Sequence, residues 1–426
     1  MATESGTSSG VTVISIEGLD SLREARENVM NQSQTVTPKI QKFPSFLRGG
    51  SNFVKQYEPT MVSLGPIHHR NSKYQSGEGY DYKQKLINDF VQASGKELVF
   101  LKQQIEKIIN QLRDFFKTEL IKNYHDDKLL ASMLCEDGCA ILQFISHPPT
   151  HEKYHVIAQD ILLLENQIPY KVLKELMRLS GNTHQLEESI ATFIEERVNL
   201  PSQEIRQVPT DGNHVHLLDL LRKTFLGGSE AGTHNSRRDL KSYPKVQELK
   251  AAGIYLRQSS DWFLRNIVFS RRFHLLRSLC LPPITVDNST MLKFLNLVAY
   301  EMCFENDGGV MSYLFFLHSL INEAQDVQEL RVAGVLCNTC FCDTDLQELF
   351  REICRKLPGD PDTHRGVRKQ IQEYYGTWMS WMLQIYHAKI RDSNWPLTIV
   401  LAVLLDLALS GTQTWIAVKT WISDKT

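Results

Sequence analysis

The chain lacks a charge excess of either sign. Its 47 lysines and arginines stand against 49 aspartates and glutamates, so that the formal net charge is −2. Such a balance provides no overall electrostatic attraction to nucleic acid or to an anionic lipid surface. We therefore predict that the protein has no nucleic-acid partner.

Secretory and cofactor-binding features are also scarce. The first ten residues have neither a basic start nor an apolar run of signal-peptide length. Eight cysteines in 426 residues are too few for the disulfide framework of a small secreted domain, and most have apolar neighbours. No phosphate-binding glycine loop is present. These absences predict a reducing compartment, no cofactor and no enzyme of a common class.

Apolar residues that recur every three or four positions dominate residues 39–392. This period is typical of amphipathic helices. It predicts helices over residues 90–124, 129–145, 161–179, 186–198, 216–222, 291–304, 311–321 and 346–356, the third of which should end or kink at Pro169. Residues 262–269 and 273–279 are richer in aromatic and β-branched side chains, which favours a short β-hairpin. The expected fold is mainly α, a multi-helix globular domain with a small β-hairpin.

Three regions differ in composition from this domain. Residues 1–38 are polar and acidic, which predicts a flexible N-terminal extension. Residues 227–239 are polar and glycine-rich, which predicts a loop insertion. Residues 395–418 form a long apolar segment that is followed by a short tail, residues 419–426.

The segment 395–418 carries a single charge, Asp406. A helix of 24 residues is long enough to cross a hydrocarbon core of about 30 Å. A central Asp costs roughly 2.5–3.5 kcal/mol on insertion, whereas each central Leu, Ile or Val contributes about 0.3–0.6 kcal/mol. Eleven such residues favour insertion by a small margin. We predict one C-terminal transmembrane helix, with a buried helix of the globular domain as the alternative. Its anchoring residues are Trp395, Leu401, Leu404, Leu405 and Trp415.

Polar residues of this segment share one helix face, because Asp406, Ser410 and Gln413 are spaced by four and three positions. Such a stripe favours contact between helices inside a membrane. It predicts a homo-oligomer formed through the anchor helix.

The orientation of the domain is predicted from the missing signal peptide. Basic residues give no preference, because two lie on each side of the segment: Lys389, Arg391, Lys419 and Lys425. A single-pass anchor with the domain in the cytosol is the simpler inference, and the plasma membrane is the favoured membrane. The glycosylation patterns at Asn31 and Asn288 would then be chance matches.

An aromatic seam precedes the apolar segment. Its residues step by four and three positions, close to a heptad: Val367, Ile371, Tyr374, Trp378, Trp381 and Ile385. Because Trp and Tyr dominate interface energetics, Tyr374, Trp378 and Trp381 are a candidate surface for an unknown protein partner. The favoured interpretation of the seam is nevertheless that this helix packs on its own domain, and the partner surface is the alternative.

Two clusters carry residue types that metal binding or catalysis would need. Cys337, Cys340 and Cys342 offer thiolates for zinc, but no second CxxC completes the site. We therefore predict no metal site and interpret these cysteines as free thiols in a loop, with zinc as the alternative. Among polar residues, an uncharacterised enzyme would use His68, His69, Glu165 and Asn166. The motif LLLENQIP is better explained by structure, with three leucines inside and residues 165–167 bonded to backbone freed near Pro169.

Seven segments together resemble the plant family of domain of unknown function 247. They are YEPTMVSLGPIHHR (57–70), EDGCAILQFI (136–145), DILLLENQIPYKVLKEL (160–176), HLLDLLR (216–222), ELKAAGI (248–254), LCLPPITVDNSTMLKFLNLVAYEMC (279–303) and LINEAQDVQELRVAGVL (320–336). The resemblance implies a membrane-associated, mostly helical plant protein without an established catalytic activity. Some grass members are linked to self-incompatibility as pollen-side determinants, which would make the domain a recognition partner. The main hypothesis is thus a membrane-tethered interaction or signalling protein.

Overall fold

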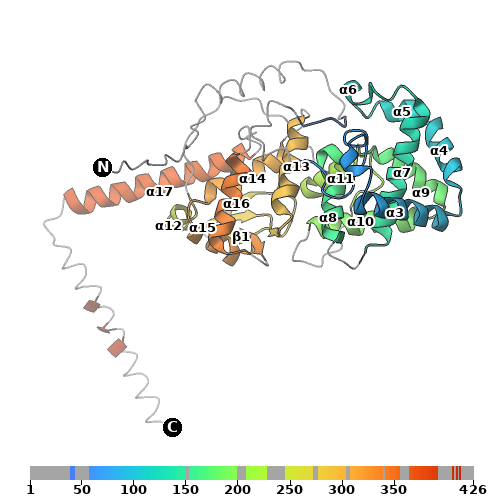
Figure 1. Ribbon diagram of the computed structural model, residues 1–426. Coiled ribbons are helices and arrows are strands. Elements are labelled where there is room, and N and C mark those ends of the chain that lie inside the picture. Colours follow the sequence, from blue (N-terminus) through green and yellow to red (C-terminus); the bar gives the residue numbers. More distant parts are fainter. Residues whose placement is uncertain are drawn as a thin grey trace, which may run out of the picture. The chain divides into compact units, whose positions relative to one another are not determined.

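The computed structural model describes residues 39–43, 57–149, 153–198, 208–227, 245–271, 277–303, 308–338, 341–355 and 364–391, with 405–406, 409–410 and 412–413. The chain divides into two compact units, Met1–Lys369 and Gln370–Thr426. The first unit contains every described element except most of α17 (Arg365–Arg391) (Figure 1). The predicted extension, residues 228–239 of the predicted loop, the tail and most of the apolar segment lie outside the described residues.

The N-terminal half of the first unit is helical. Its elements are η2 (Ser72–Tyr74), α3 (Glu78–Ser94), α4 (Leu98–Lys107), α5 (Ile109–Arg113), α6 (Thr118–Ile121), α7 (Asp127–Ser146), α8 (Lys153–Ile161), η3 (Leu164–Asn166), α9 (Tyr170–Ser180), α10 (Thr183–Val198) and α11 (Leu217–Leu226). Helix α7 is central, because α3, α4, α9 and α10 all pack against it (Figure 1). Among the described residues, α7 alone is long and apolar enough to cross a membrane, but 78% of its apolar stretch is buried inside the protein. It is therefore a core helix.

The C-terminal half of the first unit combines helices with two small sheets. Its elements are α12 (Val246–Ala251), β1 (Ile254–Gln258), β2 (Val268–Arg271), β3 (Arg277–Leu281), β4 (Ile284–Val286), α13 (Thr290–Cys303), α14 (Gly309–Leu320), α15 (Ala324–Val332), β5 (Leu336–Asn338) and α16 (Asp343–Arg355). One sheet has the order β1-β3-β2, with β1 parallel and β2 antiparallel to β3. The other pairs β4 with β5 in parallel. Helix α13 joins the halves, since it packs on η3 and α11 as well as on α14 and α16.

The mainly α class is confirmed, but two predicted elements need correction. The predicted helix 90–124 is wrong, because Gly95 ends α3 in the left-handed conformation and α4, α5 and α6 follow as separate helices. The predicted hairpin is confirmed as the antiparallel pair β2–β3. However, residues 262–267 are not strand, and the parallel strands β1, β4 and β5 were not predicted. Pro169 interrupts the predicted helix 161–179 as expected, since it is the N-cap of α9.

An irregular segment with several bends, residues 57–65, crosses the N-terminal half without a strand partner among the described residues. Two of its apolar side chains, Val62 and Leu64, are buried. It ends at Gly65, whose φ of 68° lies in the left-handed region. A Cβ added to Gly65 would overlap the carbonyl oxygen of Gln167. The close approach of these two backbone segments therefore requires glycine.

We predict that Gly65→Ala destabilises the protein more than Gly95→Ala does. Both glycines have positive φ, but an added Cβ at Gly95 meets nothing within 4 Å. The left-handed conformation alone costs a residue with a side chain about 1–2 kcal/mol, and overpacking against backbone adds about 1–3 kcal/mol. Urea unfolding followed by circular dichroism measures the two losses. Equal losses would contradict the packing of residues 57–65 against Gln167.

Candidate functional site

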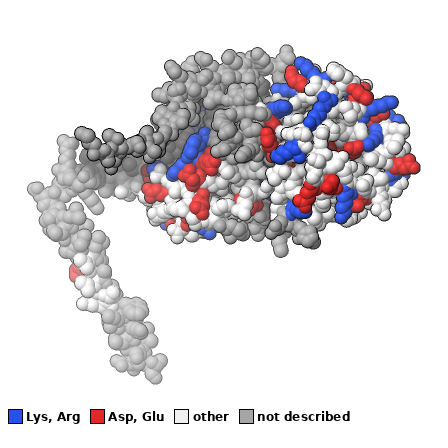
Figure 2. Space-filling model, in the orientation of Figure 1, with Lys and Arg blue, Asp and Glu red and all other residues white. Residues whose placement is uncertain are grey.

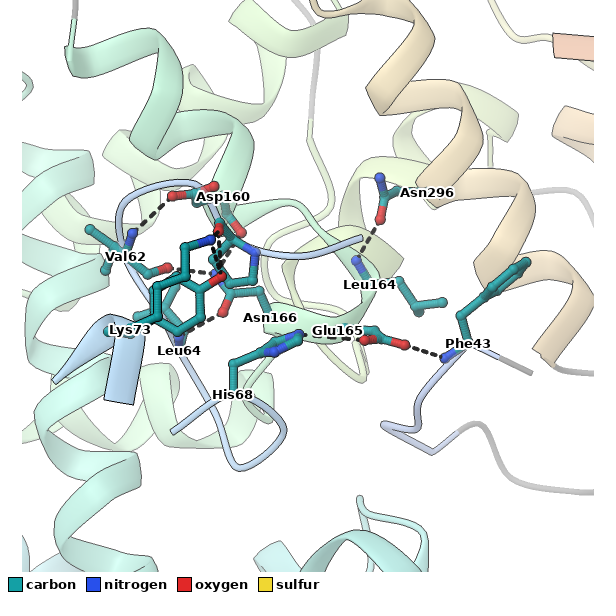
Figure 3. Close-up of polar contacts among 12 residues, drawn as sticks. Phe43, Val62, Leu64, His68, Lys73, Asp160, Leu164, Glu165, Asn166 and Asn296 are labelled. Carbon is teal, nitrogen blue, oxygen red and sulfur yellow. Dashed lines mark hydrogen bonds and ion pairs between the residues drawn. The ribbon is translucent and has the colours of Figure 1, made fainter. Parts of the chain in front are cut away.

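Side chains take the place of a neighbouring strand for residues 57–65 (Figure 3). The carboxylate of Asp160, at the end of α8, accepts bonds from the amides of residues 60–62 at 2.7, 2.7 and 2.9 Å. Asn166, in η3, accepts from the Leu64 amide at 2.6 Å and donates to the Val62 carbonyl at 2.9 Å. Buried amides without such partners are rare in folded proteins. These two side chains therefore hold the segment in place.

Asp137 of α7 holds the end of the same segment. Its carboxylate accepts from the Gly65 amide at 2.7 Å and forms an ion pair with Lys83 of α3. Lys83 also donates to the Ser63 carbonyl at 2.8 Å. Asp137 is buried, and an unpaired carboxylate there would cost several kcal/mol. Because the ion pair with Lys83 compensates its charge, the Asp137 carboxylate can accept a hydrogen bond inside the core.

Glu165 and His68, two residues of the enzyme alternative, lie together. One oxygen of Glu165 accepts from the Phe43 amide at 2.8 Å, and the other lies 3.4 Å from Nε2 of His68 (Figure 3). His69 has a separate environment beside the ring of Tyr124, and burial is the main cause that lowers its pKa. The structure therefore brings His68 and Glu165 together next to Asn166 and leaves His69 apart.

The structural explanation of LLLENQIP is confirmed with one correction. Glu165, Asn166 and Gln167 all bond to backbone, as predicted. Gln167 donates to two carbonyls of the turn before it, at 2.7 Å each. The other partners lie mostly in residues 43–64, about a hundred positions away in sequence rather than near Pro169.

A second buried network joins α11, α13 and α14. Arg222 of α11 bonds to Glu301 of α13 at 2.8 Å, and Glu301 also accepts from the first amides of α14. Tyr300 donates to Asp219 at 2.9 Å. His216, the N-cap of α11, accepts from the Asp219 amide at 3.1 Å, and burial lowers the pKa of His216 to about 4. These contacts fix α13 against the N-terminal half.

A pocket of about 490 Å³ lies between α8, the end of α10 and the start of α13. Part of its wall is apolar and comes from Ala158, Leu162 and Leu292. Asn296 of α13 also lines it and accepts from the Leu164 amide at 2.8 Å, which connects the pocket wall to η3 (Figure 3). A cavity of this size is suited to a small molecule, since ligand pockets measure about 300–1,000 Å³.

The pocket contains two cations and two carboxylates: Arg197, Lys293, Glu196 and Asp287. Lys293 is 8% exposed and donates to the Arg197 carbonyl at 2.8 Å. Burial lowers the pKa of Lys293, and Asp287 opposes this. Burial opposes ionisation of Asp287, but Lys293 and nearby hydroxyls hold its pKa below the ordinary value. Lys293 is therefore the most deeply buried of the four charged residues that line the pocket.

The structure describes two of the three cysteines that were candidates for a zinc site. Cys337 is half-buried on β5, with its thiol 3.7 Å from the Gly334 carbonyl. Cys342 is exposed beside Thr344, and Cys340 lies outside the described residues. Within the described ranges, no group of three or more His, Cys, Asp or Glu could hold a metal ion. The interpretation of these cysteines as free thiols, with zinc as the alternative, stays a prediction.

The predicted surface and anchor residues belong to the second unit. Tyr374 and Trp378 of α17 are half-exposed, and Trp381 is exposed. Leu405, Asp406, Ser410 and Gln413 are helical and exposed. The remaining anchor residues lie outside the described part of the chain: Trp395, Leu401, Leu404 and Trp415.

The pocket was not predicted from the sequence, although two of its features point toward it. Eight of its thirteen lining residues come from two segments of the family resemblance, 160–176 and 279–303. In addition, residues 151–155 read HEKYH and match the HExxH pattern, in which two histidines on one helix face bind zinc. His155 lines the pocket, whereas His151 and Glu152 lie outside the described residues.

Charged side chains are mixed over the surface. On the face drawn in Figure 2, basic and acidic residues alternate over the described helices, and no extended area of one sign forms there. Such a surface provides little attraction to a polyanion.

Comparison with known proteins gives a family and one relative. Residues 40–409 match DUF247, a family described as plant protein of unknown function. The UPF0481 protein At3g47200 of Arabidopsis thaliana is 25% identical over 414 residues, which cover 87% of this chain and 84% of that protein. No solved structure matched the chain.

We predict that stability falls as the pH decreases from 6.5 to 4, and that His216→Asn reduces this fall. Unfolded histidine takes up a proton near pH 6.5, whereas folded His216 does so at about pH 4, so acid favours unfolding by about 3 kcal/mol at most. Asparagine keeps a side-chain acceptor at the N-cap. Part of the fall persists, because burial also lowers the pKa of His364 to about 4.

Urea unfolding at each pH measures this dependence, with His125→Asn as the control. His125 is exposed, so its removal should leave the slope of stability against pH unchanged. An identical slope in His216→Asn and the unmodified protein would show that His216 is not a buried neutral group.

Proposed function

The chain belongs to the DUF247 family of plant proteins. We propose that it is a membrane-anchored recognition module that binds another protein through the aromatic face of α17. Membership confirms the family resemblance of the seven segments. The family description names no activity. The proposal therefore rests on the chemistry of the second unit.

The exposed aromatic face of α17 carries the proposal. Trp381 is 57% exposed and Met382 is 43% exposed. The rings of Tyr375 and Trp378 lie 5.8 Å apart on the same helix. Side chains of this kind supply most of the binding energy where proteins meet. An aromatic face of this kind therefore supports a protein partner.

Membrane anchoring by residues 395–418 is part of the proposal. Leu405 and Leu409 are helical and more than half exposed. Large apolar side chains in this position are stabilised by transfer to lipid, where each contributes about 0.3–0.6 kcal/mol. Asp406, Ser410 and Gln413 would then lie at a contact between anchor helices, which supports a homo-oligomer.

A cytosolic position of the domain is supported by its thiols. The seven cysteines that the structure describes are free, and three of them are buried: Cys135, Cys139 and Cys354. Free thiols persist in a reducing compartment. Asn288 would then carry no glycan, although it is exposed. The plasma membrane fits a recognition role, of which the pollen-side determinant implied by the resemblance would be a special case.

We predict that the full-length protein stays with membranes after extraction with alkaline carbonate. A chain that ends at Arg391 should move to the soluble fraction, because it lacks the apolar segment. Asp406→Leu should increase the membrane-bound fraction, since it removes an insertion cost of roughly 2.5–3.5 kcal/mol. Immunoblots of the pellet and supernatant measure both. Recovery of the full-length protein in the supernatant without detergent would refute the anchor.

We predict that Trp381→Ala lowers recovery of the partner at least tenfold. Removal of a central interface Trp typically costs 2 kcal/mol or more, which is about a thirtyfold change in affinity. Proximity labelling in plant cells identifies the partner, and quantitative co-purification measures its recovery. Val332→Ala is the control, because Val332 is an exposed apolar residue of α15. Equal recovery with both variants would exclude the aromatic face as the binding surface.

A further inference from the structure

The pocket between α8, α10 and α13 contains a buried cation with unused donors. The Lys293 ammonium has three N–H groups, and one donates to the Arg197 carbonyl. It forms no ion pair with a carboxylate in the described part of the chain. A buried charge that lacks a close counterion is costly. The remaining two donors therefore favour an anionic group inside the pocket.

Arg197 presents a second cation to the same pocket. Its guanidinium stacks on the rings of Tyr154 and Phe193 and donates to the Tyr154 hydroxyl at 2.8 Å. Its Nε atom is buried without a hydrogen-bond partner. A planar guanidinium favours carboxylate and phosphate oxygens as partners.

The two carboxylates of the pocket are already engaged. One oxygen of Asp287 accepts from the hydroxyls of Ser289 and Thr290 at 2.6 and 3.0 Å. Glu196 accepts from the Tyr154 hydroxyl at 2.7 Å and lies 3.7 Å from the Arg197 guanidinium. The Asp287 carboxylate thus orders the start of α13. Neither forms the ion pair with Lys293 that its burial requires.

The start of α13 adds a further attraction for an anion. Asp287, Asn288 and Ser289 precede this helix of 14 residues and line the pocket. The positive end of a helix dipole stabilises a nearby negative charge. The apolar wall formed by Ala158, Leu162 and Leu292 leaves room for an uncharged body.

We propose that this pocket binds a small organic anion whose carboxylate or phosphate oxygens contact Lys293 and Arg197 and whose apolar body lies against Leu162 and Leu292. The ligand supplies a directly bonded counterion to the buried ammonium, in addition to Asp287, which attracts Lys293 without forming a close ion pair. It also bridges α8, α10 and α13, so its binding stabilises the folded chain. This site is independent of the aromatic face of α17 and of the membrane anchor.

Three matched probes test the charge requirement: 1-naphthaleneacetate, 1-naphthyl phosphate and the neutral 2-(1-naphthyl)ethanol. Isothermal titration uses the full-length chain in non-ionic detergent, with micelle partition of each probe measured separately. At least one anion should bind at one site per chain, tenfold or more tighter than the alcohol. The ratio of the two anion affinities identifies the preferred oxyanion. Equal binding of the alcohol, or no saturable binding of either anion, overturns the proposal.

Lys293→Met tests the residue itself. It should weaken anion binding at least tenfold and leave alcohol binding unchanged, because it removes the charge and keeps most of the volume. Lys128→Met is the matched control, since Lys128 is exposed on α7. If Lys293→Met fails to fold, Leu292→Trp gives a second test, because the larger side chain fills the pocket and should abolish binding of all three probes. Unchanged anion affinity in either variant contradicts the assignment.

Residues 151–155 match the HExxH pattern, so a metal ion is the alternative group that could bind the anion. Each titration is therefore repeated after treatment with a chelator. Binding that persists at the same affinity assigns the anion to Lys293 and Arg197. Loss of binding after chelation overturns that assignment.

Discussion

The fold depends on how the backbone amides of residues 60–62, 64 and 65 are satisfied. An irregular segment without a neighbouring strand contains amides that, once buried, cost about 1–3 kcal/mol each if left unbonded. Asp160, Asn166 and Asp137 supply the missing acceptors. Because they come from α8, η3 and α7, the segment fixes the positions of three helical elements at once. Gly65 completes the arrangement, since only glycine leaves room for the Gln167 carbonyl.

This arrangement also positions the pocket. Helix α8 contributes Asp160 to the segment and Ala158 to the pocket wall. Through the Leu164 amide, η3 is bonded to Asn296 of α13. Lys293 lies one helical turn before Asn296, so its depth in the pocket follows from the same contacts. The core that holds residues 57–65 is thus the frame of the proposed anion site.

The sequence predicts those parts of the structure that depend on residues close together in the chain, and it does not predict contacts between distant residues. Local periodicity predicts α7 and α13 correctly, because both bury a continuous apolar stripe. It fails over 90–124, where the apolar period continues through a helix break at Gly95. Parallel strands such as β1 and β3 pair without a tight turn and leave no local pattern. The burial of Lys293 could not be predicted for the same reason, since it depends on α8 and α10, more than ninety positions away.

Hydrogen exchange of the amides of residues 60–65 tests the central claim most directly. In peptides that cover this segment, mass spectrometry should find protection comparable to that of α7, because the amides open only when the core unfolds. The exposed turn at Gly95 provides the fast-exchanging reference within the same chain. Exchange of residues 60–65 as fast as that of the turn would contradict the account, since Asp160, Asn166 and Asp137 would then not hold the segment.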